Sequence, residues 1–344
     1  MTFEEIIHQN CQNTQIHWWP KFAYHYTDIR NAVSILKSGL LYSRYDATRL
    51  GLMKTDNASS QVIDNTESNV TKSVRFFFRP MTPTQYHNEG YKHPQLRLER
   101  DRYGNCPVPV FFVFDLATLL NQAGTSFSPS SRAGFSPTMH TGIDEFRKLN
   151  FGQIYKSGPM TNPTEEKAFR QAEISHTSPF QIDSCLEAIL CRNEFEQNML
   201  LSMIARRSMD TYRKYRDKIK VCRQFMFQYN GLSISNCIYS ENKLSIVFAD
   251  TYEKKIYTQK QKARNSITQL TPVNCRIILE WHDSMGHVVH TSRATIPIDY
   301  ERPMPLRLSL PPVKDAKQLS IQLYLEDSLV GFKMQLLEEA QRVF

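Results

Sequence analysis

Short apolar runs separated by polar turns dominate the first two thirds of the chain and predict a buried sheet. The runs at 74–78 and 108–114 are rich in aromatic and β-branched residues, and prolines or polar turns bound both. Weaker runs of the same kind predict further strands at 23–26, 169–176, 186–191 and 218–227. None of these runs approaches the roughly 20 apolar residues that a membrane-spanning helix needs.

Apolar residues at helical spacing predict helices before and between these strands. In the helix expected from Asp28 to Ser38, Asp28 can cap the N-terminus and Gly39 suits the left-handed position after the last turn. Residues 2–13 predict a lead-in helix, and residues 194–216 predict one long helix. Two polar stretches, 44–73 and 121–164, predict long loops with one short helix each, and long loops in compact domains are usually functional or disordered.

The pattern changes after about residue 231. Short strand-like runs follow one another at 244–248, 275–281, 288–298, 306–310, 319–325 and 330–336, and the sequence Asp283-Ser-Met-Gly286 suits a hairpin turn. Such a series predicts a small antiparallel β-sandwich. Single cores stop growing near ~250–300 residues, so we divide the 344 residues into a lead-in at 1–19, a mixed α/β domain at 20–230 and a β-sandwich accessory domain at 231–344.

Charge adds a candidate binding surface to this picture. The formal net charge is +8, and the segment 206–223 alone has eight basic and two acidic residues. Dense positive charge suits a polyanion such as nucleic acid, although an ordinary solvated helix face has the same composition. We call these basic residues the basic segment: Arg206, Arg207, Arg213, Lys214, Arg216, Lys218, Lys220 and Arg223.

Several classes of protein are disfavoured by the motifs that the sequence lacks. It contains no GxGxxG, P-loop, HExxH, GxSxG or zinc-deaminase motif, which argues against dehydrogenases, NTPases, kinases and metalloproteases. The seven cysteines form no CxxC pair, which argues against a disulfide framework or a zinc knuckle. The N-terminus has no long apolar run, so we expect a cytoplasmic protein without a secretory signal.

Four dispersed motifs share their order with a known family. They are Tyr24-His-Tyr-Thr27 before a helix that ends at Gly39-Leu-Leu41, the aromatic stretch Phe76–Pro83, Val113-Phe-Asp-Leu116, and Arg170-Gln-Ala-Glu173. With these motifs the chain resembles, over roughly residues 20–228, the DarT-type ADP-ribosyltransferases that modify bases of nucleic acid. The resemblance implies an α+β fold with a central split antiparallel sheet, and the β-sandwich after it lies outside the resemblance.

The resemblance also implies a reaction that uses NAD⁺ as co-substrate and needs no metal. Breaking the bond between nicotinamide and ribose creates a cationic ribose, which a nearby carboxylate stabilises. Glu173 is the expected catalytic residue; it would orient a ribose hydroxyl, stabilise the cation and accept the proton of the attacking base. Without the resemblance, Glu173 would be an ordinary glutamate at a strand end and His25 a half-buried structural histidine. The expected NAD⁺ contacts are His25, Thr27, Tyr24, Arg79, Arg75 and Arg49.

One arginine of the family's NAD⁺ site has several candidates in this sequence. The family carries an arginine in the first loop that contacts the NAD⁺ phosphates, and Arg44, Arg49, Arg75 and Arg79 are all possible equivalents. Met81 stands where the family often has a further arginine, two residues after the strand. The sequence alone therefore does not select the residue that holds the phosphates.

The second polar loop and the basic segment supply the expected contacts to nucleic acid. Aromatic and basic side chains can stack on unpaired bases or bind phosphates, although ordinary loop residues have the same composition. We expect the basic segment to lie beside the active site, where it would follow the strand's backbone. The expected contacts are Arg132, His140, Tyr155, Arg170, Arg206, Arg207 and Arg213.

These features together predict a toxin-like enzyme that transfers ADP-ribose from NAD⁺ to a base of single-stranded DNA. The resemblance implies a neutralising antitoxin partner, possibly one with a macrodomain that removes ADP-ribose. Two alternatives stay open: the same chemistry on RNA, and a non-catalytic protein that binds nucleic acid through the basic segment.

Overall fold

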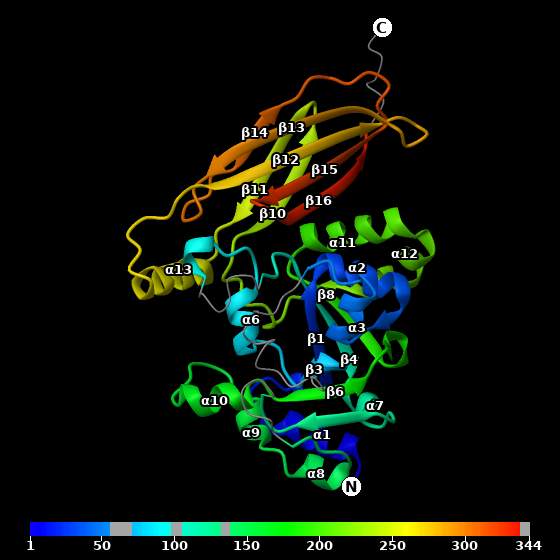
Figure 1. Ribbon diagram of the computed structural model, residues 1–344, viewed down its shortest axis with the longest axis vertical. Helices are drawn as coiled ribbons and strands as arrows, with labels where there is room; N and C mark the ends of the chain where they lie inside the picture. The colour runs from blue at the N-terminus through cyan, green and yellow to red at the C-terminus, as the bar shows by residue number, and fades with distance from the viewer. Residues whose placement is uncertain (56–70, 98–104, 132–137, 338–344) are drawn as a thin grey trace.

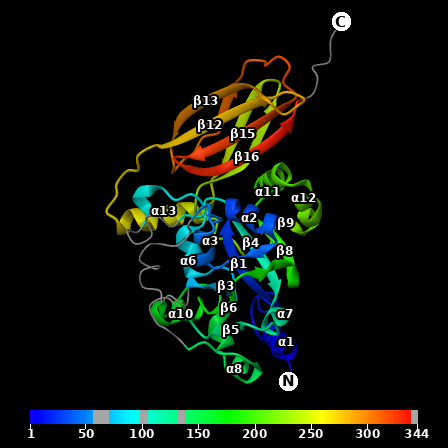
Figure 2. The same ribbon diagram turned by 45° about the vertical axis from the view of Figure 1, so that its right-hand side comes forward.

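The computed structural model describes residues 1–55, 71–97, 105–131 and 138–337. A mixed α/β region surrounds a seven-stranded sheet, and a β-rich region with two further sheets follows it (Figure 1). Turning the molecule by 45° keeps the β-rich region at one end of the long axis, with α11 (Glu194–Arg207) next to its strands β10 and β16 (Figure 2). No helix in the described ranges is long and apolar enough to cross a membrane.

The central sheet has the strand order β5-β6-β3-β1-β4-β8-β9. All its neighbours are antiparallel except β8 and β9, so the sheet is mixed rather than purely antiparallel. Within the described residues β1 and β3 are in register at one pair, Tyr24 with Phe77, which is where the predicted split lies. The strands are β1 (Phe22–Asp28), β3 (Ser73–Phe77), β4 (Pro109–Asp115), β5 (Thr125–Ser128), β6 (Glu173–Thr177), β8 (Leu186–Cys191) and β9 (Ile219–Val221).

The predicted helix after β1 is confirmed as α2 (Ile29–Ser38). The Asp28 carboxylate accepts a hydrogen bond from the amide of Arg30 at 3.0 Å and so begins the helix. Gly39 ends it with φ 69°, a left-handed conformation that glycine adopts without steric cost. The apolar face of α2 is buried in the main core, so the helix fixes β1 in place.

Helices and short strands complete this region. The lead-in helix α1 contributes Phe3, Ile6 and Ile7 to the main core, so residues 1–13 are packed with the sheet rather than separate from it. The remaining elements are α1 (Phe3–Asn13), α3 (Arg44–Arg49), α6 (Pro83–Asn88), α7 (Leu116–Leu120), α8 (Ile143–Arg147), α9 (Phe151–Ile154), α10 (Pro163–Phe169), α12 (Met209–Tyr215), β2 (Leu40–Leu41), β7 (Phe180–Gln181) and the 3₁₀ helices η1 (Trp19–Lys21), η2 (Pro94–Leu96), η4 (Ile182–Ser184) and η5 (Arg216–Lys218).

Three predicted elements differ from the structure. The expected strand at 169–176 begins later than predicted: α10 ends at Phe169, residues 170–172 form a turn, and β6 begins at Glu173. The long helix expected at 194–216 divides at Ser208, whose backbone is extended and whose hydroxyl caps α12. The strand expected at 218–227 is only three residues long, since Met226 and Phe227 leave the sheet and pack beside Tyr24 and Phe111.

The β-rich region contains two antiparallel sheets that share one core. Both sheets contribute buried side chains to it, for example Ile246 from one and Ile277 from the other. The hairpin after β12 is confirmed by the hydrogen bond from the Asp283 amide to the His287 carbonyl at 3.0 Å. The sheets are β10 (Ser233–Ser240), β11 (Lys243–Ala249) and β14 (Leu306–Ser309), and β13 (Val288–Ile298), β12 (Val273–His282), β15 (Gln318–Leu325) and β16 (Ser328–Leu336). We did not predict β10 or the helix α13 (Tyr252–Arg264).

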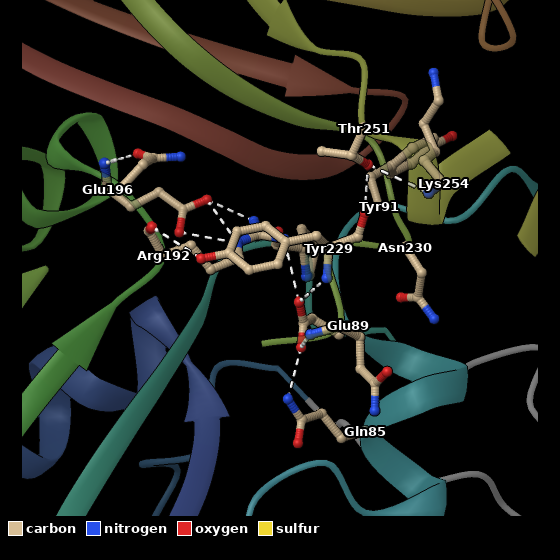
Figure 3. Close-up of polar contacts among 12 residues, drawn as sticks. Gln85, Glu89, Tyr91, Arg192, Glu196, Tyr229, Asn230, Thr251 and Lys254 are labelled. Atoms are coloured by element: carbon tan, nitrogen blue, oxygen red, sulfur yellow. Dashed lines mark hydrogen bonds and ion pairs between the residues drawn. The ribbon is translucent and has the colours of Figure 1, made fainter. Parts of the chain in front are cut away.

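A buried polar cluster joins the two regions (Figure 3). Glu89, which follows α6, accepts hydrogen bonds from the amides of Gln228 and Tyr229 at 2.8 and 2.9 Å. Arg192 lies 4.0 Å from Glu89 and pairs with Glu196 of α11 at 2.5 Å. From the β-rich region, Thr251 donates to the main-chain oxygen of Tyr229, so the segment just before β10 is held from both sides, and the boundary near residue 230 stays a proposal.

Candidate active site

Three neighbouring strands carry His25, Arg75 and Glu173. On β3, Phe77 is in register with Tyr24 of β1 on one side and with Glu173 of β6 on the other. Arg75 is two residues before Phe77, so its side chain projects from the same face of the sheet as that of Glu173. His25 follows Tyr24 and therefore projects from the opposite face, where its ring packs on Phe76 and Phe112.

Arg75 and Glu173 form a bidentate ion pair. The Nε of Arg75 donates to Oε2 of Glu173 at 2.8 Å, and Nη2 donates to Oε1 at 2.5 Å. The Glu173 side chain is 1% exposed, whereas that of Arg75 is 33% exposed. Burial disfavours the charged guanidinium, but the charge and hydrogen bonds of Glu173 outweigh it and raise the pKa of Arg75.

His25 contacts the backbone of Arg75 on β3. Its Nδ1 lies 3.0 Å from the main-chain oxygen of Arg75, and its ring packs against Phe76 and Phe112. Burial lowers the pKa of His25 to about 4, so the imidazole is neutral near pH 7. A neutral ring that contacts a carbonyl through Nδ1 carries its proton there, which leaves Nε2 as a hydrogen-bond acceptor.

A cavity of about 420 Å³ lies between β3, β5 and β6, near Arg75 in the strand register, but neither His25, Arg75 nor Glu173 lines it. Ser175 of β6 is in register with Arg75 on one side and with Ser126 of β5 on the other, and both serines line the cavity. Its lining is mostly hydroxyl groups, with one lysine at the edge of β3: Lys72, Ser73, Gly124, Ser126, Met139, Ser175, His176, Thr177 and Ser178. Such a lining can form hydrogen bonds with a sugar, a base or a phosphate.

The other expected NAD⁺ contacts have different surroundings. The Tyr24 hydroxyl donates to the main-chain oxygen of Trp19 in the core, and Thr27 is buried on β1. Arg79 is buried too; its Nη1 donates to the main-chain oxygens of Ile154 and Lys156, and burial lowers its pKa to about 9. Arg49 lies on α3 and is largely exposed. Of these residues, only Arg75 contacts Glu173.

The expected nucleic-acid contacts from the second loop do not form one surface. Arg132 lies outside the described residues. Tyr155 is buried and stacks on Phe151, with ring centroids 6.1 Å apart. Arg170 is buried as well and pairs with Glu166 at 3.1 Å, whereas His140 is partly exposed beside Glu145. The predicted roles of these residues remain predictions.

The basic segment lies away from Glu173, which corrects our expectation that it is beside the site. It comprises the end of α11, α12, η5 and the edge strand β9, and Arg206, Arg207 and Arg213 are all exposed. Five strand spacings separate β6 from β9 in the sheet order. At about 4.8 Å per spacing, the two strands are roughly 24 Å apart, because the sheet places them near opposite edges.

Sequence reasoning missed the serines of β5 and β6. The strand Thr125–Ser128 lies in a stretch whose polar composition predicts a loop, so nothing in the sequence singles out Ser126. The described residues contain no group of three or more His, Cys, Asp or Glu side chains that could hold a metal ion.

Comparisons with known proteins place these strands in a family. A family model described as "ssDNA thymidine ADP-ribosyltransferase, DarT" matches residues 24–222, more than half of the chain. Two solved structures of Thermus sp. 2.9 DarT are similar to this chain. The complex with ADP-ribosylated ssDNA has 16% sequence identity and a TM-score of 0.48, and the match covers 60% of this chain and 94% of that chain. Its complex with NAD⁺ has 14% identity, a TM-score of 0.45 and covers 59% and 96%.

A third similar structure is Thermosipho africanus DarTG in complex with ADP-ribose. It has 14% identity and a TM-score of 0.47, and the match covers 64% of this chain and 54% of that chain. A search of curated proteins found no match.

Proposed function

The chain belongs to the DarT family of single-stranded-DNA thymidine ADP-ribosyltransferases, and from this premise we propose that it transfers ADP-ribose from NAD⁺ to a thymidine base of single-stranded DNA. NAD⁺ is the co-substrate of this chemistry and nicotinamide is the leaving group. The observation that best supports the proposal is that the family match includes β1, β3 and β6, the strands that carry His25, Arg75 and Glu173.

The proposed reaction exchanges one glycosidic bond for another. The bond between C1′ of the ribose and the nicotinamide nitrogen breaks, and the nicotinamide leaves with the bonding electrons as a neutral molecule. A ring nitrogen of thymine attacks C1′ and loses its proton. Glu173 stabilises the positive charge that develops on the ribose and accepts that proton, so that one carboxylate serves both charge stabilisation and general base catalysis.

His25 and the cavity next to Arg75 have complementary roles in this proposal. The neutral His25 accepts a hydrogen bond from a ribose hydroxyl through Nε2, while Nδ1 keeps its bond to the Arg75 carbonyl. The hydroxyl groups of Ser126 and Ser175 lie on the side of Arg75 away from β1 and offer donors and acceptors to the substrate. Tyr24, Thr27 and Arg79 stabilise the strands that hold these groups.

We infer a path for the DNA strand from the distribution of charge. The basic segment lies roughly 24 Å along the sheet from β6, and its exposed arginines can bind backbone phosphates. A strand whose thymidine is at Glu173 reaches this segment only when several nucleotides extend beyond the base. The basic segment therefore increases the affinity for longer strands without taking part in the reaction.

A neutralising partner also follows from the family. A toxin-like transferase that modifies DNA must be held inactive in the cell that makes it, and an antitoxin that removes ADP-ribose or covers the cavity next to Arg75 would do this. The proposal is tested by expressing the chain with and without candidate antitoxins and measuring both growth and ADP-ribose on DNA.

The activity itself is tested by mass spectrometry. Purified protein is incubated with NAD⁺ and with oligonucleotides of equal length that contain one thymidine, no thymidine, or the corresponding RNA sequence. We expect one added ADP-ribose on the thymidine-containing DNA alone. Modification of the RNA would change the substrate class, and labelled protein with unmodified oligonucleotides would indicate a transferase that acts on proteins.

A further inference from the structure

We propose that Arg75 is a positioning residue for Glu173: it holds the buried carboxylate in one orientation, turned toward the substrate. This inference rests on the proposed function and adds to it a strand arginine whose role is to hold the catalytic acid. Arg75 is one of the four arginines that the sequence offers as candidates for the phosphate contact. The inference assigns it a different role, the positioning of Glu173.

The geometry of the pair fixes the orientation of the carboxylate. Both oxygens of Glu173 accept a hydrogen bond from one planar guanidinium, at 2.8 and 2.5 Å, so the carboxylate cannot rotate without breaking a bond. A single bond or a lysine ammonium would leave that rotation free. Orientation matters because a displacement of about 1 Å at a reacting group can cost roughly 100-fold in rate.

The backbone of β3 in turn holds Arg75. Its carbonyl contacts His25 on β1 at 3.0 Å, and Arg75 is paired with Ser175 of β6 on the other side. The arginine thus projects from a residue that is held on both sides at the place where the sheet divides. His25 and Glu173 do not contact each other directly among the contacts described, and Arg75 connects them.

Arg75 also supplies the counter-charge of a buried carboxylate. The Glu173 side chain is 1% exposed, and burying a charge without a partner is costly. From β5, the residue in register with Glu173 is the uncharged Ser128, and His25 of β1 is neutral. Arg170 is paired with Glu166, and Arg79 donates to main-chain oxygens. Among the described residues, Arg75 is therefore the counter-charge of Glu173.

The ion pair with Arg75 leaves part of the hydrogen-bonding capacity of the Glu173 carboxylate available. An ionised carboxylate has about four acceptor positions, and Arg75 occupies two of them. The remaining positions can accept a ribose hydroxyl and, later, the proton of the base. Arg75 is itself one-third exposed, so the pair is reached from solvent on the side of its guanidinium.

The test compares Arg75→Gln and Arg75→Lys with Arg276→Gln, a control at a half-buried arginine that packs on Tyr324 in the β-rich region. We measure kcat and the KM for NAD⁺. We expect Arg75→Gln to lower kcat about 100-fold with little change in KM. Arg75→Lys should restore only part of kcat, because it retains the charge without the bidentate geometry.

Two results would overturn the proposal. One is a loss that appears as a higher KM for NAD⁺ with kcat unchanged, which would make Arg75 a cofactor-binding residue. The other is an unchanged enzyme. A double-mutant cycle of Arg75→Gln with Glu173→Gln, measured by thermal unfolding, tests the pairing without any activity. If the parent protein transfers no ADP-ribose, the proposed function fails, while a coupling in this cycle would still establish the pair.

Discussion

At the scale of single residues, the surroundings of Arg75 and Arg79 distinguish two arginines that the sequence presents as equivalent candidates. Arg75 and Arg79 are four residues apart around the same strand, but Arg75 faces Glu173 and Arg79 is bound to main-chain oxygens in the core. The motifs single out Glu173 and His25 in the sequence, and the roles of both residues stay predictions. The sequence could not predict the partner of Glu173, because that partner depends on the register of β3 with β6.

His25 should make the stability of the protein depend on pH. Burial lowers the pKa of His25 from 6.5 to about 4, so between these values the unfolded chain binds a proton that the folded protein does not. The free energy of unfolding should therefore fall as the pH decreases from about 6.5 to about 4, by at most about 1.4 kcal/mol per pH unit from this group.

The measurement is denaturant unfolding of the parent protein and His25→Gln at several pH values. We expect the variant to lose part of the slope in this window, whereas the control His8→Gln, at an exposed histidine on α1, should retain it. Identical slopes in the parent and His25→Gln would contradict the assigned burial of the imidazole.

At the scale of elements, the sequence predicted those helix ends that interactions between residues close in sequence determine. The cap at Asp28 and the glycine at 39 define α2, and both are visible in the sequence. By contrast, Ser208 interrupts a continuous helical pattern, and β5 forms in a polar stretch because β6 lies beside it. Sheet order is also a tertiary property, which is why the distance between β6 and the basic segment could not be predicted.

This distance leads to a prediction about strand length. The double variant Arg207→Glu and Arg213→Glu should weaken the binding of long single-stranded DNA and reduce its salt dependence by about 0.7 for each lost phosphate contact. Oligonucleotides of three nucleotides should bind the variant and the parent equally, since they cannot span roughly 24 Å. The measurement is a salt titration of affinity for both lengths.

Arg293→Glu, at an exposed arginine on β13, serves as the matched control for a reversed charge. It should leave both affinities close to those of the parent. If the double variant loses the same affinity for short and for long strands, the basic segment binds DNA at the active site. That result would contradict the separation that the strand order gives.

At the scale of the whole molecule, the buried cluster around Arg192 holds the chain segment that leads from the mixed α/β region into the β-rich region (Figure 3). Arg192 pairs with Glu196 and lies near Glu89, which holds the chain segment before β10. The sequence shows the change in composition near residue 231 but not this cluster, because Glu89 is more than 100 residues away from Arg192 and Glu196.

Removing Arg192 should therefore destabilise the protein strongly. Arg192→Met leaves two buried glutamates without their counter-charge, and breaking such a buried pair costs about 3–5 kcal/mol. Arg213→Met, which removes an exposed pair with Asp210, should cost less than about 1 kcal/mol. Denaturant unfolding measures both, and similar losses in the two variants would contradict the importance of burial at this junction.

The central claim is that Glu173 carries out transfer of ADP-ribose to thymidine. Its most direct test is the rate at which Glu173→Gln modifies an oligonucleotide with a single thymidine, compared with the parent and with Glu187→Gln, a control at an exposed glutamate on β8. The account predicts that Glu173→Gln binds the oligonucleotide like the parent but transfers ADP-ribose at least about 100-fold more slowly, while Glu187→Gln is unchanged. A Glu173→Gln variant that retains the parent's rate would contradict it.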